Sequence, residues 1–128
     1  MKTIIVLLLL LLSMPSFSQK FYDPSGKLLC RFGGDTVFNG SGLQIGRIAG
    51  GQILDGTGHP KGRIDGSVIF DASDKKIGWI NRNDLFDGSG KQSGKIDGDN
   101  LLDGIGDRIG SAEKLTRMQI IIFFYYFY

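Results

Sequence analysis

The sequence repeats itself with a period of 16 residues, and this feature limits the possible folds more than any other. An acidic or amide residue recurs at that interval with no insertion or deletion, as Asp23, Asn39, Asp55, Asp71, Asp87 and Asp103. Three residues later, five of the six copies have glycine. A fixed period of this length is typical of repeat proteins, in which one unit cannot bury its apolar face alone. We therefore expect one array of six similar units.

Each copy has the pattern of a β-hairpin. An apolar pair such as Ile53-Leu54 precedes the Asp, and branched or aromatic residues bounded by turn signals indicate strands. The Asp-Gly-Ser-Gly type of sequence that follows predicts a tight turn, because the Asp side chain accepts backbone N–H groups ahead of it and glycine adopts positive φ. A second strand and a second turn complete the unit. The predicted hairpins are residues 21–34, 37–50, 53–66, 69–82, 85–98 and 101–112.

A second glycine column predicts which face of each hairpin is buried. It consists of Gly46, Gly62, Gly78, Gly94 and Gly110, and Cys30 takes its place in the first copy. Side-chain alternation places Gly46 and Ile48 on one face of a strand, and Ile45 and Arg47 on the other. Glycine at one site in many copies indicates that each backbone comes close to another group. We expect the glycines and isoleucines to face a common axis or the neighbouring hairpin.

The column next to these glycines is the candidate binding surface. Its members are Arg31, Arg47, Arg63, Trp79 and Lys95. They are expected to point outward, with their stems covering apolar surface. The alternative is a solvated face that is neutralised by nearby carboxylates. Trp79 is either a platform on which a sugar stacks or a filler for the glycines that its copy lacks.

The irregular fourth copy of the repeat indicates how the copies are arranged in space. Isolated hairpins are marginal in water, so these must stack in a closed ring or along a solenoid. The fourth copy lacks both turn glycines in its segment from Asp71 to Asp74. A solenoid with two ends gives no reason for an irregular unit in its middle, which favours a ring.

The C-terminal segment, residues 113–128, departs from the repeat. Ser111 to Gln119 is rich in helix formers and begins with a fair N-cap, which predicts one short helix. Ile120 to Tyr128 is an uncharged run of nine apolar or aromatic residues. It either packs at the axis or over one mouth of the ring as core, or contacts a partner or a membrane surface. Nine residues are too few to cross a bilayer as a helix.

The N-terminal segment, residues 1–18, has the layout of a secretory signal. Lys2 supplies the positive charge, Ile4 to Leu12 is apolar, and small residues precede a cleavage site between Ser18 and Gln19. The sequence therefore predicts export to the periplasm or the cell exterior. Without Lys2 the chain has 14 basic and 13 acidic residues, a balance that does not favour nucleic acid as a partner.

No catalytic, cofactor-binding or metal-binding residue is predicted. His59 is the sole histidine and has no serine and carboxylate placed around it by any motif, so it is interpreted as a turn residue. The Asp column suggests calcium, but the copies lack the known calcium-loop spacings, and the Asp recurs wherever the turn does. Cys30, the single cysteine, is interpreted as an apolar filler.

The chain resembles the 5-fold β-flower proteins of Bacteroidetes. The resemblance rests on the signal peptide, the tandem units such as Asp55 to Gly66 and Asp87 to Gly98, and the aromatic C-terminus. It implies an all-β fold of hairpins arranged radially like petals or propeller blades, and it brings no activity and no catalytic residue. Residues 19–112 and 113–128 are expected to form one domain, with a short helix and the apolar tail packed at the axis.

The function expected from these features is that of an exported, non-enzymatic structural or binding module at the cell envelope. Its partner would be an envelope protein or a glycan. One alternative is attachment to the membrane through Ile120 to Tyr128, and the others are a carbohydrate-binding module or a hydrolase.

Overall fold

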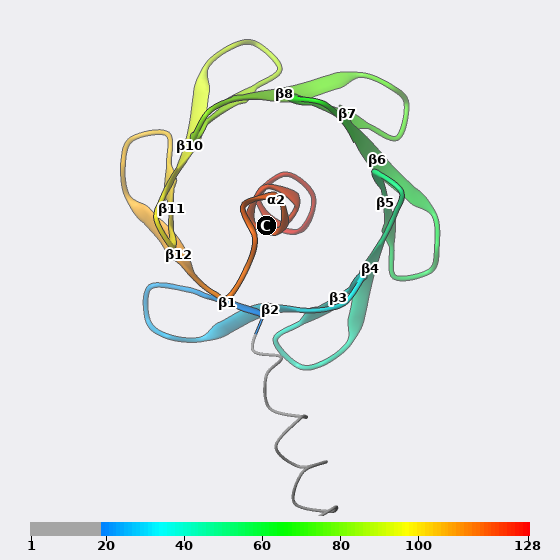
Figure 1. Ribbon diagram of the computed structural model, residues 1–128, viewed down its shortest axis with the longest axis vertical. Coiled ribbons are helices and arrows are strands. Elements are labelled where there is room, and N and C mark those ends of the chain that lie inside the picture. The colour runs from blue at the N-terminus through cyan, green and yellow to red at the C-terminus, as the bar shows by residue number, and fades with distance from the viewer. Residues whose placement is uncertain (1–18) are drawn as a thin grey trace, which may run out of the picture.

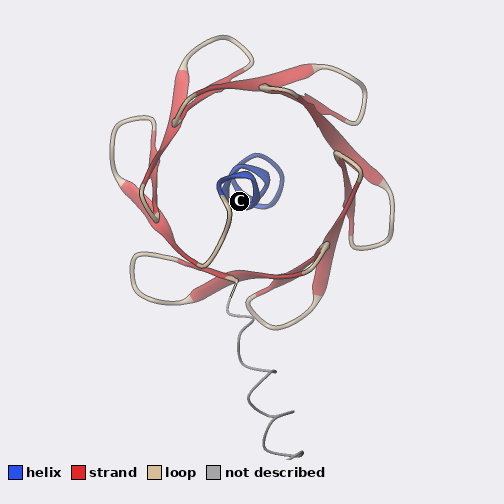
Figure 2. Ribbon diagram, in the orientation of Figure 1, coloured by secondary structure: helices blue, strands red, loops and turns tan. Residues whose placement is uncertain are grey.

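The chain forms a ring of β-hairpins around a central helix, as the computed structural model shows for residues 19–128 (Figure 1, Figure 2). Over these residues there are twelve strands: β1 (Lys20–Tyr22), β2 (Leu28–Gly33), β3 (Thr36–Asn39), β4 (Gln44–Ala49), β5 (Gln52–Asp55), β6 (Pro60–Asp65), β7 (Val68–Asp71), β8 (Lys76–Asn81), β9 (Asp84–Asp87), β10 (Gln92–Asp97), β11 (Asn100–Asp103) and β12 (Arg108–Glu113). The helix α2 (Arg117–Ile122) continues directly into the π-helix η1 (Phe123–Phe127). The predicted signal peptide, residues 1–18, lies outside the described residues.

The ring is closed. Each strand pairs antiparallel with the next one, and β1 pairs with β12. Two strands and the Asp turn between them form one petal, numbered 1 to 6 from β1–β2 to β11–β12, and these turns project from the ring in Figure 1. The predicted radial all-β arrangement is confirmed, and the ring closes with six petals rather than five. Closure removes the exposed strand edges that a solenoid would have to protect.

Neighbouring petals are joined by two-residue turns at the opposite end of the barrel. In the turn between Asp65 and Val68 the first residue is Gly66, with φ of +61°. A two-residue hairpin needs positive φ at this position, which glycine adopts without strain. The irregular fourth copy keeps the same turn with Arg82 at φ of +59°. The missing glycine therefore leaves the path of the chain unchanged and introduces local strain instead.

Each petal contains a β-bulge, and this corrects one prediction. The pairing of β3 with β4 shifts register between Val37 and Phe38, so that Gln44 and Gly46 pair and Ile45 between them does not. Strict alternation placed Ile45 on the outer face with Arg47. The structure packs Ile45 against the core instead, because the extra residue of a bulge changes the direction of the side chain there.

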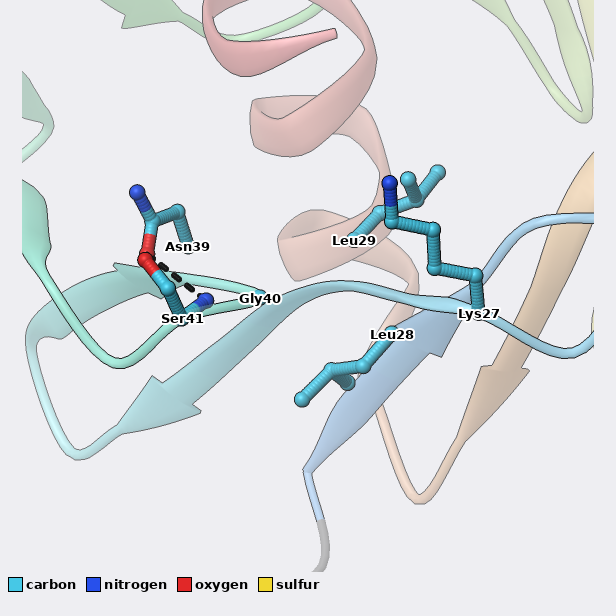
Figure 3. A pocket seen from close by; sticks show the side chains of 6 residues that line it. All are labelled: Lys27, Leu28, Leu29, Asn39, Gly40 and Ser41. Atoms are coloured by element: carbon cyan, nitrogen blue, oxygen red, sulfur yellow. Dashed lines mark hydrogen bonds between the residues drawn. The ribbon is translucent and has the colours of Figure 1, made fainter.

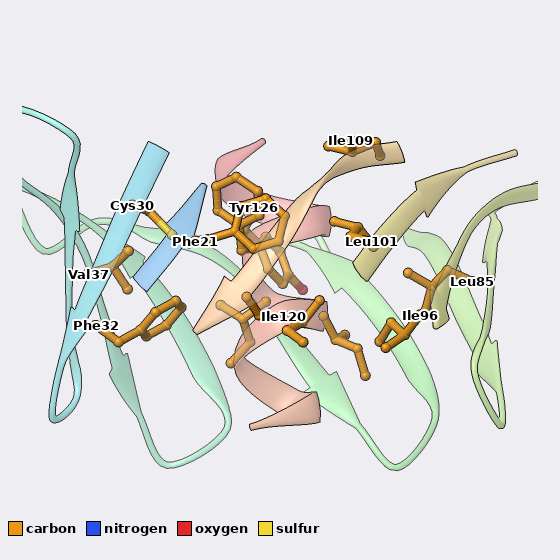
Figure 4. Packing of buried hydrophobic residues seen from close by; sticks show 14 of the residues in the cluster. Phe21, Cys30, Phe32, Val37, Leu85, Ile96, Leu101, Ile109, Ile120 and Tyr126 are labelled. Carbon is orange, nitrogen blue, oxygen red and sulfur yellow. The ribbon is translucent and has the colours of Figure 1, made fainter. Parts of the chain in front are cut away.

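The core consists of inward-facing side chains of the barrel around the central helix (Figure 4). The inner positions of the odd-numbered strands are all fully buried: Phe21, Val37, Ile53, Ile69, Leu85 and Leu101. Ile80 and Ile96 are also buried, and Ile48 and Ile64 pack against the same cluster. Of the two expected directions for the isoleucines, the common axis is therefore the correct one.

The C-terminal tail fills this centre. Ile120 to Phe123 and Tyr126 are buried, and the tail lies inside the ring in Figure 1. The second glycine column makes room for it, since a Cβ on Gly46 would overlap the ring of Phe127 and one on Gly62 would overlap Tyr126. The group that each copy approaches closely is thus the aromatic tail.

The predicted short C-terminal helix is confirmed, but it spans Arg117–Ile122 and not Ser111 to Gln119. Ser111 and Ala112 belong to β12, where they pair with Tyr22 and Phe21 and so close the barrel. The helix begins after Thr116, whose side chain accepts from the Gln119 N–H while the Gln119 side chain accepts from the Thr116 N–H. Strand pairing outweighs local helix propensity in Ser111–Glu113, and the apolar tail becomes helical instead. Neither helical segment within residues 19–128 is long and apolar enough to cross a membrane.

Candidate functional site

The Asp column forms the turns at the tips of the petals. In petal 3 the Asp55 Oδ1 accepts from the Thr57 N–H at 2.9 Å, the Thr57 hydroxyl at 2.7 Å and the His59 N–H at 2.9 Å. The turns of petals 1, 2, 4 and 5 have the same three bonds, and in petal 6 Asp103 accepts from two backbone N–H groups. One oxygen of each side chain is therefore committed to its own turn.

These bonds favour the charged form of the carboxylates. The Thr57 hydroxyl and the backbone N–H groups lower the pKa of Asp55 to about 2. The serine hydroxyl two residues ahead is the main cause that lowers the pKa of Asp23, Asp71 and Asp87. Within residues 19–128 no group of three His, Cys, Asp or Glu side chains could hold a metal ion. The geometry of the column is that of a structural turn.

His59 lies on the surface of the petal 3 turn, with 80% of its side chain exposed. Its Nδ1 is 2.7 Å from the Thr57 Oγ1, whose proton is donated to Asp55. In a hydrolytic triad the carboxylate orients the imidazole, and the imidazole accepts the proton of the hydroxyl. Here the hydroxyl donates directly to the carboxylate, so the three groups are not arranged for nucleophilic attack.

The basic column lies on the outer face of the barrel and packs on apolar side chains of the adjoining strand. The guanidinium of Arg31 lies 4.2 Å from the ring centroid of Phe38, and that of Arg63 lies 4.1 Å from Phe70. Arg47 and Lys95 stand across from Leu54 and Leu102 in the strand pairing. The column is thus a set of separate side-chain pairs around the barrel.

Trp79 takes the same position in petal 4. Its indole stacks on Phe86 with 4.1 Å between ring centroids and 9° between planes. The Lys76 Nζ lies 5.9 Å from the centroid of the indole. One face of the Trp79 ring is therefore used by Phe86, and a lysine lies near the indole.

Grooves between neighbouring petals bring together residues that are distant in the repeat. Groove 1–2, between petals 1 and 2, has a volume of about 480 Å³ (Figure 3). Groove 4–5 has about 390 Å³ and groove 5–6 about 350 Å³. Each is formed by the first residues after the turn of one petal and by the turn of the next. Groove 1–2 is lined by Lys27, Leu28, Leu29, Asn39, Gly40 and Ser41. Groove 4–5 is lined by Lys75, Lys76, Ile77, Gly88 and Ser89. Groove 5–6 is lined by Asp87, Lys91, Gln92, Ser93, Asp103, Gly104 and Ile105.

Groove 3–4 is nearly filled, with about 40 Å³ remaining. Pro60 of petal 3 and Ala72 of petal 4 line it. At the position of Pro60 the other petals have a more flexible residue, and at the position of Ala72 petals 2, 3, 5 and 6 have glycine. An ion pair between Arg63 and Asp74, 3.1 Å apart, joins the two petals. Asp74 is the residue that replaces a turn glycine in the fourth copy. The irregularity of that copy therefore closes one groove.

A further pocket of about 280 Å³ lies at the opposite end of the barrel. It is lined by Ile48, Gly51, Ile53, Ile64, Gly66, Met118 and Ile122, between the barrel wall and the start of the central helix. It contains no polar side chain.

The sequence interpretation singled out the outer basic column and missed the grooves. The signal for the grooves was the residue four positions after each Asp, which is lysine at Lys27, Lys75 and Lys91. These lysines line grooves 1–2, 4–5 and 5–6, and the equivalent residues of the other petals are Leu43, His59 and Asp107.

The comparisons with known proteins agree with this architecture. No curated protein and no solved structure matches the chain. The family model described as 5-fold beta-flower protein matches residues 16–128, which includes every petal and the central helix. The chain therefore belongs to the 5-fold β-flower protein family.

Proposed function

We propose that this protein is an exported, non-enzymatic binding module of the cell envelope, which holds its ligand in the grooves between petals. The observation that carries the proposal is the equivalence of grooves 1–2, 4–5 and 5–6, which are built from the same repeat positions. Equivalent sites on one rigid ring can engage one extended ligand several times, and such avidity exceeds the affinity of any single site.

A binding role fits the chemistry of the polar residues. The Asp side chains hold their own turns, and the hydroxyl, imidazole and carboxylate of petal 3 are not arranged as a triad. The Cys30 thiol is fully buried, and burial raises its pKa to about 12, which suppresses the reactive thiolate. Export is inferred from the sequence of residues 1–18.

The position of the aromatic tail favours the grooves, and not a membrane anchor, as the surface that contacts other molecules. Ile120 to Phe123 and Tyr126 are buried in the barrel, and Tyr128 is the exposed aromatic residue of this segment, at 68%. The apolar area that attachment through the tail would need is thus used by the core.

The proposal is tested by filling the grooves. Ser41 and Ser89 are exposed residues that line grooves 1–2 and 4–5, and both donate a hydroxyl to the turn. The double variant Ser41→Trp/Ser89→Trp should lose the envelope material that the wild-type protein retains in a pull-down. Ser73→Trp is the matched control, since it removes the same turn bond beside the filled groove. Equal retention by the double variant and the wild type would refute the grooves as the binding surface.

Export is tested separately by mass spectrometry of the protein from its native cells. We expect a mature N-terminus at Gln19 in the envelope or the medium. Intact Met1 on a protein confined to the cytoplasm would contradict the proposal.

A further inference from the structure

We propose that the ligand of the grooves is an acidic polysaccharide, and that grooves 1–2 and 4–5 bind its negatively charged groups. This inference rests on the proposed function and names the class of ligand. It follows from the charges that line each groove, from the residues beside groove 4–5 and from the positions of the two grooves in the ring.

Grooves 1–2, 4–5 and 5–6 differ in charge although they are built from the same repeat positions. Groove 1–2 has Lys27 and no carboxylate in its lining, because the turn residue there is Asn39. Groove 4–5 is lined by two lysines, Lys75 and Lys76, and the carboxylate nearest to its lining is that of Asp87, which precedes Gly88 in the turn of petal 5. Groove 5–6 has Lys91 together with Asp87 and Asp103. Anionic groups are therefore attracted to the first two grooves, and in the third the carboxylates compensate the lysine.

The lysines of the first two grooves form no salt bridge within residues 19–128. The salt bridges within residues 19–128 join Arg63 to Asp65 and Asp74, and the His59 Nδ1 lies 3.9 Å from the Asp55 Oδ1. None of them uses Lys27, Lys75 or Lys76, so these ammonium groups can move toward an incoming anion without breaking a salt bridge. The charges of Lys27 and Lys75 do act on the carboxylates of their own turns, where they contribute to the lowered pKa of Asp23 and Asp71.

Several features favour a saccharide over an acidic peptide. Two arginines that could grip peptide carboxylates with their planar fork, Arg31 and Arg63, are stacked on phenylalanine rings. The grooves instead offer single ammonium charges beside small polar groups, the Asn39 amide and the Ser89 hydroxyl. Their apolar lining residues, such as Leu28 and Ile77, suit the C–H faces of sugar rings.

Groove 4–5 has an aromatic residue next to its charge. Lys76 lines the groove, and its Nζ lies 5.9 Å from the centroid of the Trp79 ring. A sugar whose carboxylate binds Lys76 would come close to the indole, on which C–H groups of a sugar ring can pack. Trp79 is the single tryptophan of the chain, so its fluorescence reports on this groove alone.

The two cationic grooves lie on opposite sides of the ring. Three petals separate groove 1–2 from groove 4–5 in a ring of six, at the lower and upper edges of the ring in Figure 1. A polymer long enough to reach both binds with avidity, whereas a short oligomer occupies one groove at a time. Polymers are therefore expected to bind more tightly than their own fragments.

The test uses polygalacturonate as the probe and its fully methyl-esterified, uncharged form as the comparison. Binding is measured by isothermal titration calorimetry and by Trp79 fluorescence, at low and high salt. We expect the full-length mature protein to bind polygalacturonate, to change its fluorescence on binding and to bind less tightly as salt is raised. The esterified polymer should bind at least tenfold more weakly.

Charge reversals locate the sites. Lys27→Glu and Lys75→Glu should each weaken binding by about fivefold or more, as expected for the loss of one surface ion pair of about 1 kcal/mol. Lys91→Glu is the matched control from the compensated groove and should change the affinity by less than twofold. All three residues are exposed turn positions, and thermal unfolding should confirm that the variants remain folded.

The inference is overturned if Lys91→Glu weakens binding as much as Lys75→Glu, or if the esterified polymer binds as well as polygalacturonate. It is also overturned if duplex DNA binds as tightly as polygalacturonate, or if no acidic polysaccharide binds. A different result would refute the proposed function. That result is equal retention of envelope material by the wild-type protein and the groove-filled Ser41→Trp/Ser89→Trp variant in the pull-down.

Discussion

Gly78 of β8 occupies the position at which the ring of Tyr125 reaches the barrel wall. A Cβ added to Gly78 would overlap this ring and would lie 2.6 Å from the carbonyl oxygen of Phe86. The same relationship recurs around the barrel, between Gly46 and Phe127, Gly62 and Tyr126, and Gly94 and Phe124. Four consecutive aromatic residues thus meet four consecutive petals, because successive residues of a helix point in different directions around its axis.

The glycine column should be coupled energetically to the tail. Gly94 is the mildest position, where an added Cβ would lie 2.9 Å from the Phe124 Cζ and 3.1 Å from the Leu102 oxygen. Gly94→Ala should lower the free energy of unfolding by about 1–3 kcal/mol through overpacking. In urea denaturation the double variant Gly94→Ala/Phe124→Leu should be more stable than the sum of the single changes predicts. Additive changes would show that the two residues are not packed together.

The tyrosine hydroxyls of the tail should stabilise the bulged strands. The Tyr126 hydroxyl has one proton, which the Phe70 oxygen at 2.7 Å and the Arg63 oxygen at 3.0 Å share as acceptors. Tyr126→Phe removes the donor and leaves two half-buried carbonyls, which should cost about 1–2 kcal/mol in urea denaturation. Tyr128→Phe changes an exposed hydroxyl and should leave stability unaltered. An equal effect of both changes would contradict the role of these bonds.

Alkaline pH should unfold the protein through ionisation of two tyrosines of the tail, Tyr125 and Tyr126. Burial raises the pKa of Tyr125 and of Tyr126 to about 12, against about 10 in the unfolded chain. The folded state holds these protons more tightly, so the stability they contribute is complete below about pH 10 and is lost as the pH rises through about 12. Ultraviolet titration should detect their ionisation together with the loss of circular dichroism. Normal ionisation near pH 10 in a folded protein would refute the burial of the hydroxyls.

Low pH should weaken the Asp turns, as high pH weakens the tyrosine contacts. The pKa of Asp55 is lowered to about 2 in the folded state, so its contribution is present above about pH 4 and is lost as the pH falls through about 2. Asp55→Asn keeps a side-chain oxygen for the three bonds, as Asn39 does in petal 2, and no longer titrates. This variant should unfold at a lower pH than the wild type while remaining close to it in stability at neutral pH. Acid unfolding at the same pH in both proteins would contradict this account.

The strain at Arg82 should be removable. Its φ of +59° lies in the left-handed region, where a residue with a Cβ pays about 1 kcal/mol or more relative to glycine. Arg82→Gly should therefore raise the free energy of unfolding by about 1 kcal/mol, measured by thermal denaturation. Arg82→Ala retains the Cβ and should give no such gain. Equal stabilisation by both would assign the effect to the arginine side chain rather than to the backbone.

Some of the fold could be predicted because it depends on local chemistry repeated without interruption. The 16-residue period, the Asp turn and the alternation of Gly46, Arg47 and Ile48 were sufficient to predict hairpins with an inner and an outer face. Ile45 was assigned to the wrong face, since a bulge is created by the register of two strands and has no clear signal within one of them. The helix was misplaced because Ser111–Glu113 has partners in β1, some 90 residues earlier in the sequence.

The grooves could not be predicted from residue spacing. Lys27 and Ser41, or Lys76 and Ser89, face one groove only because two petals lie side by side at a particular angle. The sequence also held no indication that Arg63 would reach Asp74 and that Pro60 and Ala72 would fill the groove between their petals.

By itself, then, the sequence determined the repeated unit and the side of it that must be dry, because turn geometry and side-chain alternation act over a few neighbouring residues. The tertiary structure decided that all six units close into one ring, that the aromatic tail fills its centre and which petals leave a groove open. These outcomes depend on the packing of side chains from distant segments, whose shapes and charges match only after the ring has formed.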